Sequence, residues 1–562
     1  MDRKKAATAA FFVARRKLAA MSLAPFRFSL PAPLVGRPLA ALLAIYLLVG
    51  TTGHLPWRGD DLTHLGPIHA ILQGGSWLMP EIAGETYLGA APLYYWVGAL
   101  LAKLLGWLLP VHDAARLATS LFCAATLYWT GLAARRLYGE ASFAPAILLG
   151  MGSLGLVVHA HETQPQLAQI AGMALCFAGL GEISEHPRRG GIQAGLGVAL
   201  AFLASGLSGL ALTLPVIFLT PLLCPRCRNP IVARGIATGL GIALMISGLW
   251  LTAAAYSHPG EVTLWWREEL LSTTPHASRV SELGKLVQLF GWFAWPLWPI
   301  AGWAVWRNRH AIASPQLALP LMASIIAVVL VTSTGGLRTA GLLPVLPPLC
   351  LLAAFGVTSL RRGAANAFDW FGVMAFIFFG IVVWLGWSAL HFSWPPGLAR
   401  QVARMAPDFQ HGGWVSGALV GLALSLLLVL LPLFTQRSVQ RGATNWALGM
   451  TLLWCLAVTL WQPWFAHTKN YQPLASELSQ TIGPQPGCIK RRNVGDTQRA
   501  ALDYFANIRT LPYDSEEDCR LLLTYTAGGV ASRSVPPEWH VMWERRLGGG
   551  RKAETFKLYR RD

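Results

Sequence analysis

The sequence predicts a polytopic all-α membrane protein with about thirteen transmembrane helices and a small C-terminal α/β domain on the external side. Of the 562 residues, 54% are hydrophobic and only 13% are charged, which is about half the charged share of a soluble domain. In addition, apolar stretches long enough to cross a bilayer alternate with short basic loops. These properties exclude a soluble enzyme, a disordered chain and a secreted disulfide scaffold.

Residues 1–37 are predicted to form a basic cytoplasmic arm. They contain eight Lys and Arg residues against the single acid Asp2. Lys and Arg mark the cytoplasmic side of a membrane protein, and such an arm is attracted to anionic lipid. No small-residue cleavage site follows an apolar run here, so we expect no cleaved signal peptide.

The later basic clusters divide the chain into helical hairpins that leave the cytoplasm and return to it. These clusters are Arg135-Arg136, Arg188-Arg189, Arg226 with Arg228 and Arg234, Arg307 with Arg309, Arg361-Arg362, and Arg437 with Arg441. Together with the arm, they orient a membrane domain over residues 38–463. The predicted spans are 38–56, 113–134, 141–160, 164–183, 190–206, 208–225, 235–256, 283–305, 315–333, 341–360, 366–390, 413–435 and 444–463.

Residues 92–109 are apolar enough to span the membrane but are not counted among the spans. If they crossed, every later basic cluster would face outward, against the positive-inside rule. We therefore expect this segment to lie along the outer face, within a long first external loop over residues 57–112. A first loop of this length is typical of enzymes that work at the membrane surface.

Residues 464–562 are predicted to form the external α/β domain. The segment holds 15 basic and 11 acidic residues, an ordinary composition for a folded domain. Helices are expected at 471–482 and 496–508, and alternating patterns predict strands near 521–525 and 556–559. Cys488 and Cys519 both lie in this domain, on the oxidising side of the membrane. A disulfide between them and two free thiols are equal alternatives.

Two adjacent carboxylates, Asp60 and Asp61, follow the first span directly, after Trp57-Arg58-Gly59. Carboxylates at the edge of a bilayer are costly unless they are hydrated, paired or used. A solvated pair of loop acids is the simpler interpretation. The adjacent Arg58 and the amphipathic stretch 62–72 favour a functional site.

The segment from Trp57 to Trp96 resembles membrane glycosyltransferases of the GT-C type, a family that includes the bacterial aminoarabinose transferase of lipid A and the protein O-mannosyltransferases. These enzymes carry an Asp-Glu pair after their first span. A segment similar to "gdWl.P.l.G..Y..KPPL.YW" follows in a long external loop. The corresponding residues here run from Gly75-Ser76-Trp77 through Tyr87 to Pro92-Leu93-Tyr94-Tyr95-Trp96. Weaker similarity is found at Leu342–Pro348 and Tyr471–Ala475.

The resemblance implies a GT-C-like membrane domain that transfers a sugar from a polyprenyl-phosphate donor. The acceptor would be lipid A, another glycan or a protein at the periplasmic face of the bacterial inner membrane. The N-terminus would then be cytoplasmic and the C-terminal domain periplasmic. We expect membrane lipids as partners and no nucleic acid.

The resemblance also implies roles for the acidic residues. Asp60 matches the family's catalytic base, and Asp61 matches the acid that orients the site or helps to hold an ion. In the second external loop, Glu162 and His161 are candidate ligands of a divalent cation such as Mg, Mn or Zn. The closest alignment places Gln164, which is not an acid, at the family's acidic position, and a hydrated turn between two spans is an equal alternative.

Four outer-face arginines are candidate partners of the donor phosphate, because inverting sugar transfer needs positive charge where the phosphate departs. They are Arg58, Arg267, Arg279 and Arg338. Simple interfacial anchoring is an equal alternative for Arg338.

The chain departs from the family at positions that contact the donor in relatives. The Lys and first Pro of "KPPL" correspond to Ala90 and Ala91, a Lys-Gly pair corresponds to Ser205-Gly206, and the Tyr before "LLP" corresponds to Gly341. A catalytically degenerate relative that binds a polyprenyl lipid or scaffolds an envelope complex is therefore a second hypothesis. A transporter is the third, and the near absence of charge at mid-span disfavours it.

Overall fold

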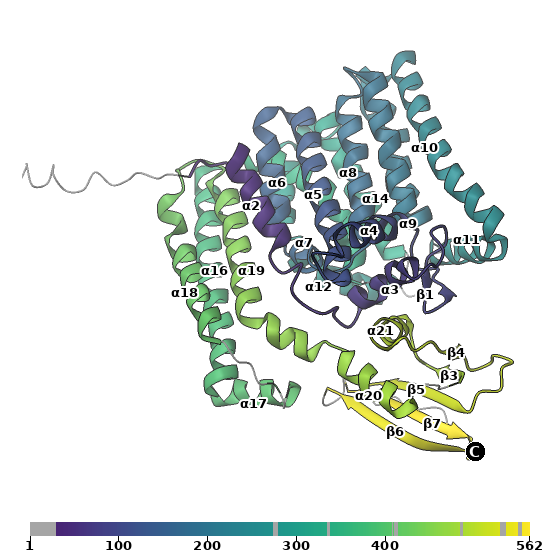
Figure 1. The fold of residues 1–562 in the computed structure, drawn as a ribbon. Helices are drawn as coiled ribbons and strands as arrows, with labels where there is room; N and C mark the ends of the chain where they lie inside the picture. The colour runs from purple at the N-terminus through teal and green to yellow at the C-terminus, as the bar shows by residue number, and fades with distance from the viewer. Residues whose placement is uncertain are drawn as a thin grey trace, which may run out of the picture.

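The structure is a computed structural model that describes residues 30–273, 279–333, 338–406, 409, 414–483, 487–528, 536–548 and 553–561, with the side chains of 272–283 outside the description. A bundle of long helices makes up most of the molecule, and the α/β domain packs below one end of it (Figure 1). This arrangement confirms the predicted fold class of a helical membrane protein with a C-terminal sheet domain.

Within the described residues, eight helical segments are long and apolar enough to cross a membrane. They are α5 (Val111–Tyr138), α9 (Pro187–Leu223), α10 (Pro230–Ser257), α14 (Pro315–Ser333), η4 (Ala340–Val345) with α15 (Leu346–Val357), α16 (Arg362–Phe392), α18 (Trp414–Phe434) and α19 (Arg441–Thr468). Large apolar side chains such as Leu419 and Leu433 on α18 are exposed, as expected for helices that face lipid.

The remaining predicted spans fall on shorter or interrupted helices, so the total of thirteen stays a prediction. These are α2 (Gly36–Leu48), α6 (Phe143–Met151) followed by α7 (Leu154–His159), α8 (Gln166–Glu182), and α12 (Arg279–Phe293) followed by α13 (Leu297–Arg307). The last pair is separated by a break that contains Trp295 and Pro296.

The chain of α9 reverses at Ser205 and Gly206, so α9 is a tight hairpin. Gly206 has a φ of +53° and a ψ of −132°, a conformation that glycine adopts without strain. A Cβ on Gly209 would lie 2.1 Å from the carbonyl oxygen of Ala201, which requires the two arms to pack against each other. This reversal falls between the predicted spans 190–206 and 208–225.

The predicted first external loop contains α3 (Asp60–Leu72), the hairpin of β1 (Glu81–Ile82) and β2 (Glu85–Thr86), and α4 (Leu93–Leu105). With 13 residues, α4 is about 20 Å long, whereas the hydrocarbon core of a bilayer is about 30 Å thick. The helix packs against α3 and α5. It is therefore too short to cross, as the positive-inside argument requires for residues 92–109.

The C-terminal domain is a five-stranded mixed sheet with the order β4-β3-β5-β7-β6. The strand β3 pairs in parallel with β4 and β5, while β7 pairs antiparallel with β5 and β6. The elements are α20 (Gln472–Ile482), β3 (Ile489–Arg492), α21 (Asp496–Ala506), β4 (Leu511–Pro512), β5 (Leu521–Ala527), β6 (Trp539–Leu547) and β7 (Glu554–Arg561). Cys488 and Cys519 form a disulfide, which settles the alternative left open by the sequence.

The helix α3 belongs to both parts of the molecule. Its Leu62 is fully buried in the hydrophobic core of the C-terminal domain, together with Leu474 and Leu502. Thr63 exchanges a hydrogen bond of 2.6 Å with Thr497. The domain therefore packs directly on the helix that begins with the two carboxylates.

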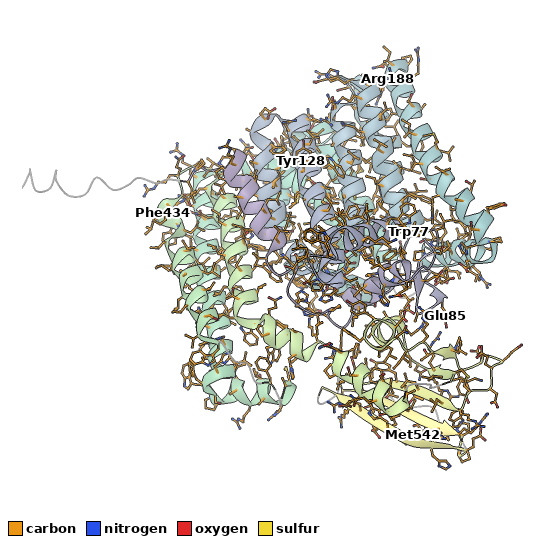
Figure 2. The ribbon with its side chains drawn as sticks, in the orientation of Figure 1. Trp77, Glu85, Tyr128, Arg188, Phe434 and Met542 are labelled. Carbon is orange, nitrogen blue, oxygen red and sulfur yellow. A yellow bond between two sulfur atoms is a disulfide. The ribbon has the colours of Figure 1, made fainter. Side chains whose placement is uncertain are left out.

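Ion pairs fasten the β1–β2 hairpin to the same domain, and Figure 2 shows Glu85 on the side of the bundle that faces the sheet. The carboxylate of Glu85 accepts hydrogen bonds of 2.6 Å from both Nη1 and Nη2 of Arg491 and lies 2.9 Å from Nη2 of Arg499. The Arg499 side chain is only 8% exposed, so its charge depends on this partner and on Asp496.

Replacement of Glu85 with Gln should loosen this attachment, because it leaves Arg491 and the buried Arg499 with less negative charge. We expect a loss of about 2 kcal/mol in local stability and roughly 30-fold faster amide hydrogen exchange in β1, β2 and β3. Glu140→Gln is the matched control, since Glu140 forms an exposed pair with Arg135. Equal exchange rates in the two variants would contradict this role.

Candidate active site

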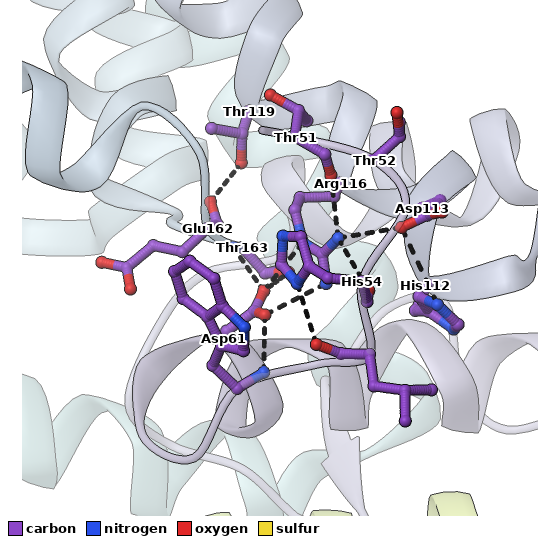
Figure 3. A network of polar contacts seen from close by, with 12 residues as sticks. Thr51, Thr52, His54, Asp61, His112, Asp113, Arg116, Thr119, Glu162 and Thr163 are labelled. Carbon is purple, nitrogen blue, oxygen red and sulfur yellow. Dashed lines mark hydrogen bonds and ion pairs between the residues drawn. The ribbon is translucent and has the colours of Figure 1, made fainter. Parts of the chain in front are cut away.

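The two acids at the start of α3 have different environments. Asp61 is 1% exposed, and its carboxylate accepts five hydrogen bonds (Figure 3). Two come from Nε and Nη2 of Arg116, at 3.2 and 3.1 Å. The others come from the backbone and hydroxyl of Thr163, at 2.8 and 2.6 Å, and from the backbone of Trp57, at 2.9 Å.

Arg116 is fully buried and joins Asp61 to a second acid. Its Nη1 donates to Asp113 at 3.0 Å and to the carbonyl oxygen of Thr51 at 2.8 Å. Asp113 also accepts a hydrogen bond of 2.8 Å from the backbone of Gly53. This ion triad (Asp61, Arg116 and Asp113) ties the end of α2, the start of α3, the outer end of α5 and the loop before α8 into one unit.

Burial by itself would raise the pKa of Asp61, but the charge of Arg116 and the hydrogen bonds from Arg116 and Thr163 outweigh it, so the pKa of Asp61 lies well below its usual value of 3.8. A carboxylate offers about four lone-pair sites, and all are engaged here. Of the two roles that the resemblance implies for Asp61, the structure supports orientation of the site.

Asp60 lies beside this triad, and its side chain is only partly buried. Nε2 of Gln164 lies 3.5 Å from its Oδ2. One turn along α3, Nδ1 of His64 lies 3.0 Å from the hydroxyl of Tyr95. Burial lowers the pKa of His64 to about 4, so this imidazole is neutral at pH 7.

Arg338 is brought to the same place from a distant part of the sequence. Burial is the main influence on His64 and Tyr87, but the charges of Arg338 and Asp60 both act on the pKa of each group, in opposite directions. Arg338 is exposed and lies just before η4. Asp60 and Arg338, two of the predicted site residues, thus both influence the pKa of His64 and the pKa of Tyr87.

Glu162 reaches the same cluster through two neighbours. Its Oε1 lies 2.6 Å from Nδ1 of His159, and Nε2 of Gln164 lies 3.5 Å from both that nitrogen and Asp60. The second nitrogen of His159 and the amide oxygen of Gln164 are buried without a hydrogen-bond partner among the described residues. Gln164, at the family's acidic position, therefore lies between Asp60 and the His159–Glu162 pair.

His161 points away from this cluster. Its nitrogens lie 3.1 and 2.7 Å from the carbonyl oxygens of Val157 and Tyr46, and its ring stacks on Trp454 at 4.2 Å. Burial lowers the pKa of His161 to about 4. Because both nitrogens are directed at backbone carbonyls, His161 offers no ligand atom beside Glu162, contrary to its predicted role.

The acidic cluster does not form a ready-made cation site. Within the described part of the chain, one group of three potential ligands lies within 4.8 Å of one another, namely Cys488, Glu517 and Cys519. Two of these are oxidised to the disulfide. Asp60 and Glu162 are connected through the side chains of Gln164 and His159, and the divalent cation stays a prediction.

The other predicted arginines are distributed differently. Arg58 is held by the C-terminal domain: it pairs with Glu554 at 3.1 Å, donates to the carbonyl oxygen of Thr468, and lies over the ring of Tyr471. Arg267 is exposed on α11 (Pro259–Thr273). Arg279 begins α12, and its side chain lies outside the described residues.

At the positions where the chain departs from the family, the structure has either small buried residues or open space. Ala90 and Ala91 are buried, and a Cβ on Gly341 would meet no atom within 4 Å. At the tip of the α9 hairpin, the Glu269 carboxylate accepts a hydrogen bond of 3.0 Å from the backbone of Leu207. Burial raises the pKa of Glu269 to about 7, so an acid lies next to the turn where relatives carry Lys-Gly.

Arg116, Asp113 and Thr163 were missed in the sequence, although one signal was available. Asp113 and Arg116 are charged residues three positions apart at the outer end of an otherwise apolar span. Charges at that spacing lie on the same helix face, and charges within a span are usually paired. Nothing in the sequence indicated that Asp61 is their third member.

A bundle of long apolar helices, a first loop that carries the two carboxylates, and an α/β domain after the last long helix together make up a fold that is also found in a solved membrane-protein structure. The crystal structure of ArnT from Cupriavidus metallidurans bound to undecaprenyl phosphate has this fold. It superposes with a TM-score of 0.65 at 16% identity and covers 92% of this chain and 97% of that chain. The apo structure of the same protein gives a TM-score of 0.64.

Two curated relatives are named undecaprenyl phosphate-alpha-4-amino-4-deoxy-L-arabinose arabinosyl transferase. The protein from Serratia proteamaculans is 25% identical over 230 residues, 39% of this chain and 40% of the relative. The protein from Pseudomonas aeruginosa is 28% identical over 239 residues, 40% of this chain and 42% of the relative. The chain thus matches about two fifths of the length of these relatives. No protein-family model matches it.

The ion triad should make stability depend on acidity through Asp61. Because the pKa of Asp61 is lowered by folding, its contribution is fully present above about pH 4 and is lost as the pH falls toward the folded value. We expect Asp61→Asn to lower the free energy of unfolding by about 3 kcal/mol at pH 7. Thermal unfolding in detergent between pH 7 and pH 3 should show this gap to the wild type narrowing below about pH 4; a constant gap would contradict the assignment.

Proposed function

We propose that this protein transfers a sugar from a polyprenyl-phosphate donor to lipid A, another glycan or a protein at the periplasmic face of the bacterial inner membrane. One observation carries the proposal: Asp60 has a partly exposed carboxylate directly beside the buried ion triad, at the outer face of an ArnT-like fold. The names of the curated relatives and the undecaprenyl phosphate bound to ArnT support the same chemistry.

Asp60 acts as the base in this proposal. A base must come within hydrogen-bond distance of the acceptor hydroxyl or amine. Among the described residues, the side chain of Asp60 has one hydrogen-bond contact, of 3.5 Å, to Gln164, which the acceptor can replace. Asp61 is excluded from this role because all of its lone pairs are occupied. Its contacts to Arg116 and Thr163 fix the first turn of α3 and therefore the position of Asp60.

Arg338 receives the departing lipid phosphate, because it is the predicted arginine whose charge acts on the groups around Asp60. Arg267 and Arg279 stay candidate partners of the phosphate; Arg267 is exposed on α11, and the Arg279 side chain lies outside the described residues. Arg58 is already neutralised by Glu554, and its role is to hold the C-terminal domain. Guanidinium groups suit this task, since they bind phosphate through two parallel hydrogen bonds.

The polyprenyl chain occupies an apolar cavity of about 330 Å³ between α7, α12, α16 and α19. Leu154, Trp292, Phe376 and Met450 are among its lining residues. The cavity lies close to the polar cluster, because the ring of Phe293, next to Trp292 in sequence, packs 6.3 Å from the ring of His159. An isoprenoid chain would therefore leave its phosphate near Asp60.

The donor sugar differs from aminoarabinose in this proposal. Ala90 and Gly341 replace the Lys and Tyr that relatives direct at the donor, and the open space at Gly341 changes the shape of the pocket. The same two replacements favour the second candidate function, a non-catalytic protein that binds a polyprenyl lipid. Saturable binding of undecaprenyl phosphate without turnover of any lipid-linked sugar would support that alternative.

Asp60→Asn should lower sugar transfer by about 10²- to 10⁴-fold, the usual contribution of a general base. Transfer is measured in membrane vesicles supplied with labelled lipid-linked sugars, with mass spectrometry of lipid A and other envelope glycans as the product assay. Asp514→Asn is the matched control, because Asp514 is an exposed acid of the C-terminal domain. Full activity of the Asp60 variant would overturn the assignment.

Filling the apolar cavity should weaken the use of a long polyprenyl donor. Gly291 lines the cavity, and a Cβ at this position would meet no atom within 4 Å. We expect Gly291→Trp to raise the KM for the undecaprenyl donor on the order of tenfold, through loss of about 1.4 kcal/mol of apolar contact, and to change the KM for a two-isoprene donor little. Gly248→Trp is the control, since a Cβ at Gly248 on α10 also meets open space; equal effects would contradict the assignment.

A further inference from the structure

A second cavity, of about 500 Å³, lies at the opposite end of the bundle from Asp60. Arg58 contacts the C-terminal end of α19 through the carbonyl oxygen of Lys469, whereas this cavity lies at the N-terminal end of the same helix. Figure 2 shows Phe434, the last residue of α18, far from the C-terminal domain marked by Met542. The lining residues include Asn366, Asp369, Trp370, Leu433, Arg437 and Arg441. Arg437 and Arg441 form one of the clusters predicted to be cytoplasmic.

One wall of the cavity is a polar network around Asp369, in which Nε of Arg441 is buried without a hydrogen-bond partner among the described residues. The carboxylate of Asp369 accepts a hydrogen bond of 2.6 Å from Asn445 and lies 3.4 Å from Nε of Arg441. Asn445 in turn accepts a hydrogen bond of 2.7 Å from the hydroxyl of Thr435. The negative charge of Asp369 is therefore neutralised within the wall.

The rim of the cavity carries positive charge at Arg437, which forms no ion pair with an acid of the described residues. Arg437 is exposed there, next to Ser438. The helix α19 begins at Arg441, is 28 residues long, and its N-cap residue Gln440 makes no side-chain capping hydrogen bond. The backbone N–H of Arg441 donates to the carbonyl oxygen of Ser438 at 3.2 Å. The positive end of the helix dipole favours an anion at this position.

The other side of the cavity is apolar and lies on the surface of the helix bundle. Trp370 on α16 is 66% exposed and Leu433 on α18 is 77% exposed. Such a pairing of an anion-binding rim with an exposed apolar wall matches a molecule that has a phosphate head and hydrocarbon chains. The cytoplasmic leaflet is rich in anionic lipids of this type.

The N-terminal segment joins the bundle at the same place. The backbone of Leu30 exchanges hydrogen bonds of 2.8 and 3.0 Å with Phe434 and Gln436. The sequence before Leu30 contains seven basic residues and one acid. The segment is positively charged, like Arg437, so the two repel each other. The charges therefore favour an anionic molecule in the cavity, and they disfavour the N-terminal segment as its occupant.

We propose that this cavity binds an anionic phospholipid of the cytoplasmic leaflet. The phosphate lies at Arg437, Ser438 and the first turn of α19, and an acyl chain lies against Trp370 and Leu433. This site is separate from the sugar-transfer site and does not depend on the proposed function.

Binding is tested on the purified, delipidated protein in detergent by native mass spectrometry and thermal unfolding. Phosphatidylglycerol should bind saturably and raise the Tm, while phosphatidylcholine with the same acyl chains should do neither. We expect Arg437→Gln to weaken phosphatidylglycerol binding on the order of tenfold, the effect of one charge-assisted contact of about 1.4 kcal/mol. Arg226→Gln is the matched control, because Arg226 is exposed in another cluster of the same predicted face.

Two further measurements test whether the acyl chain contributes to binding and whether phosphate binds without a lipid. Trp370→Ala should reduce the advantage of dioleoyl over dihexanoyl phosphatidylglycerol without changing the preference for the anionic headgroup. Inorganic phosphate alone should raise the Tm little. The proposal is overturned if Arg437→Gln and Arg226→Gln bind phosphatidylglycerol equally, if the two headgroups bind equally, or if inorganic phosphate protects as well as the lipid does.

Discussion

The candidate site depends on one buried arrangement of charges, in which Arg116 lies between Asp61 and Asp113. Two carboxylates and one guanidinium would be costly so far from water, but every oxygen of Asp61 is occupied by a short hydrogen bond. The triad joins the end of α2, the first turn of α3, the outer end of α5 and Thr163. The triad fixes the position of Asp60, which is next to Asp61 in the sequence. Because Asp61 makes the hydrogen bonds that hold the triad, the carboxylate of Asp60 is left available to react.

The C-terminal domain is the second constraint on the same helix. Leu62 on α3 is part of the domain's core, and Glu85 is held by Arg491 and Arg499. Arg58 pairs with Glu554 from the last strand. The helix that carries Asp60 is therefore fixed on its membrane side by the triad and on its outer side by the sheet, which explains why a small domain packs against an otherwise apolar bundle.

The charges of this chain divide into two groups with separate tasks. At the proposed outer face, the charges of Asp60 and Arg338 both act on His64 and Tyr87, and we propose that the apolar cavity nearby holds a lipid-linked donor. At the other face, Arg437 and the start of α19 border a cavity suited to an anionic phospholipid. Beside Asp60, the buried Arg116 is paired with Asp61 and Asp113, as the low dielectric of a protein interior requires.

The sequence by itself determined the features that depend on local composition. Apolar stretches between basic clusters predicted most helices, and α20 and α21 lie where their patterns placed them. The helix α4 is too short to cross a bilayer, in agreement with the positive-inside argument that residues 92–109 do not span the membrane. Only the tertiary structure decided which charges act together: it paired Arg58 with Glu554 and turned His161 toward backbone carbonyls. It also lets Arg338 and Asp60, more than two hundred residues apart in sequence, both influence the pKa of His64. The physical reason is that hydropathy is a sum over neighbours along the chain, whereas an ion pair or a hydrogen bond depends on distances of about 3 Å that packing alone sets.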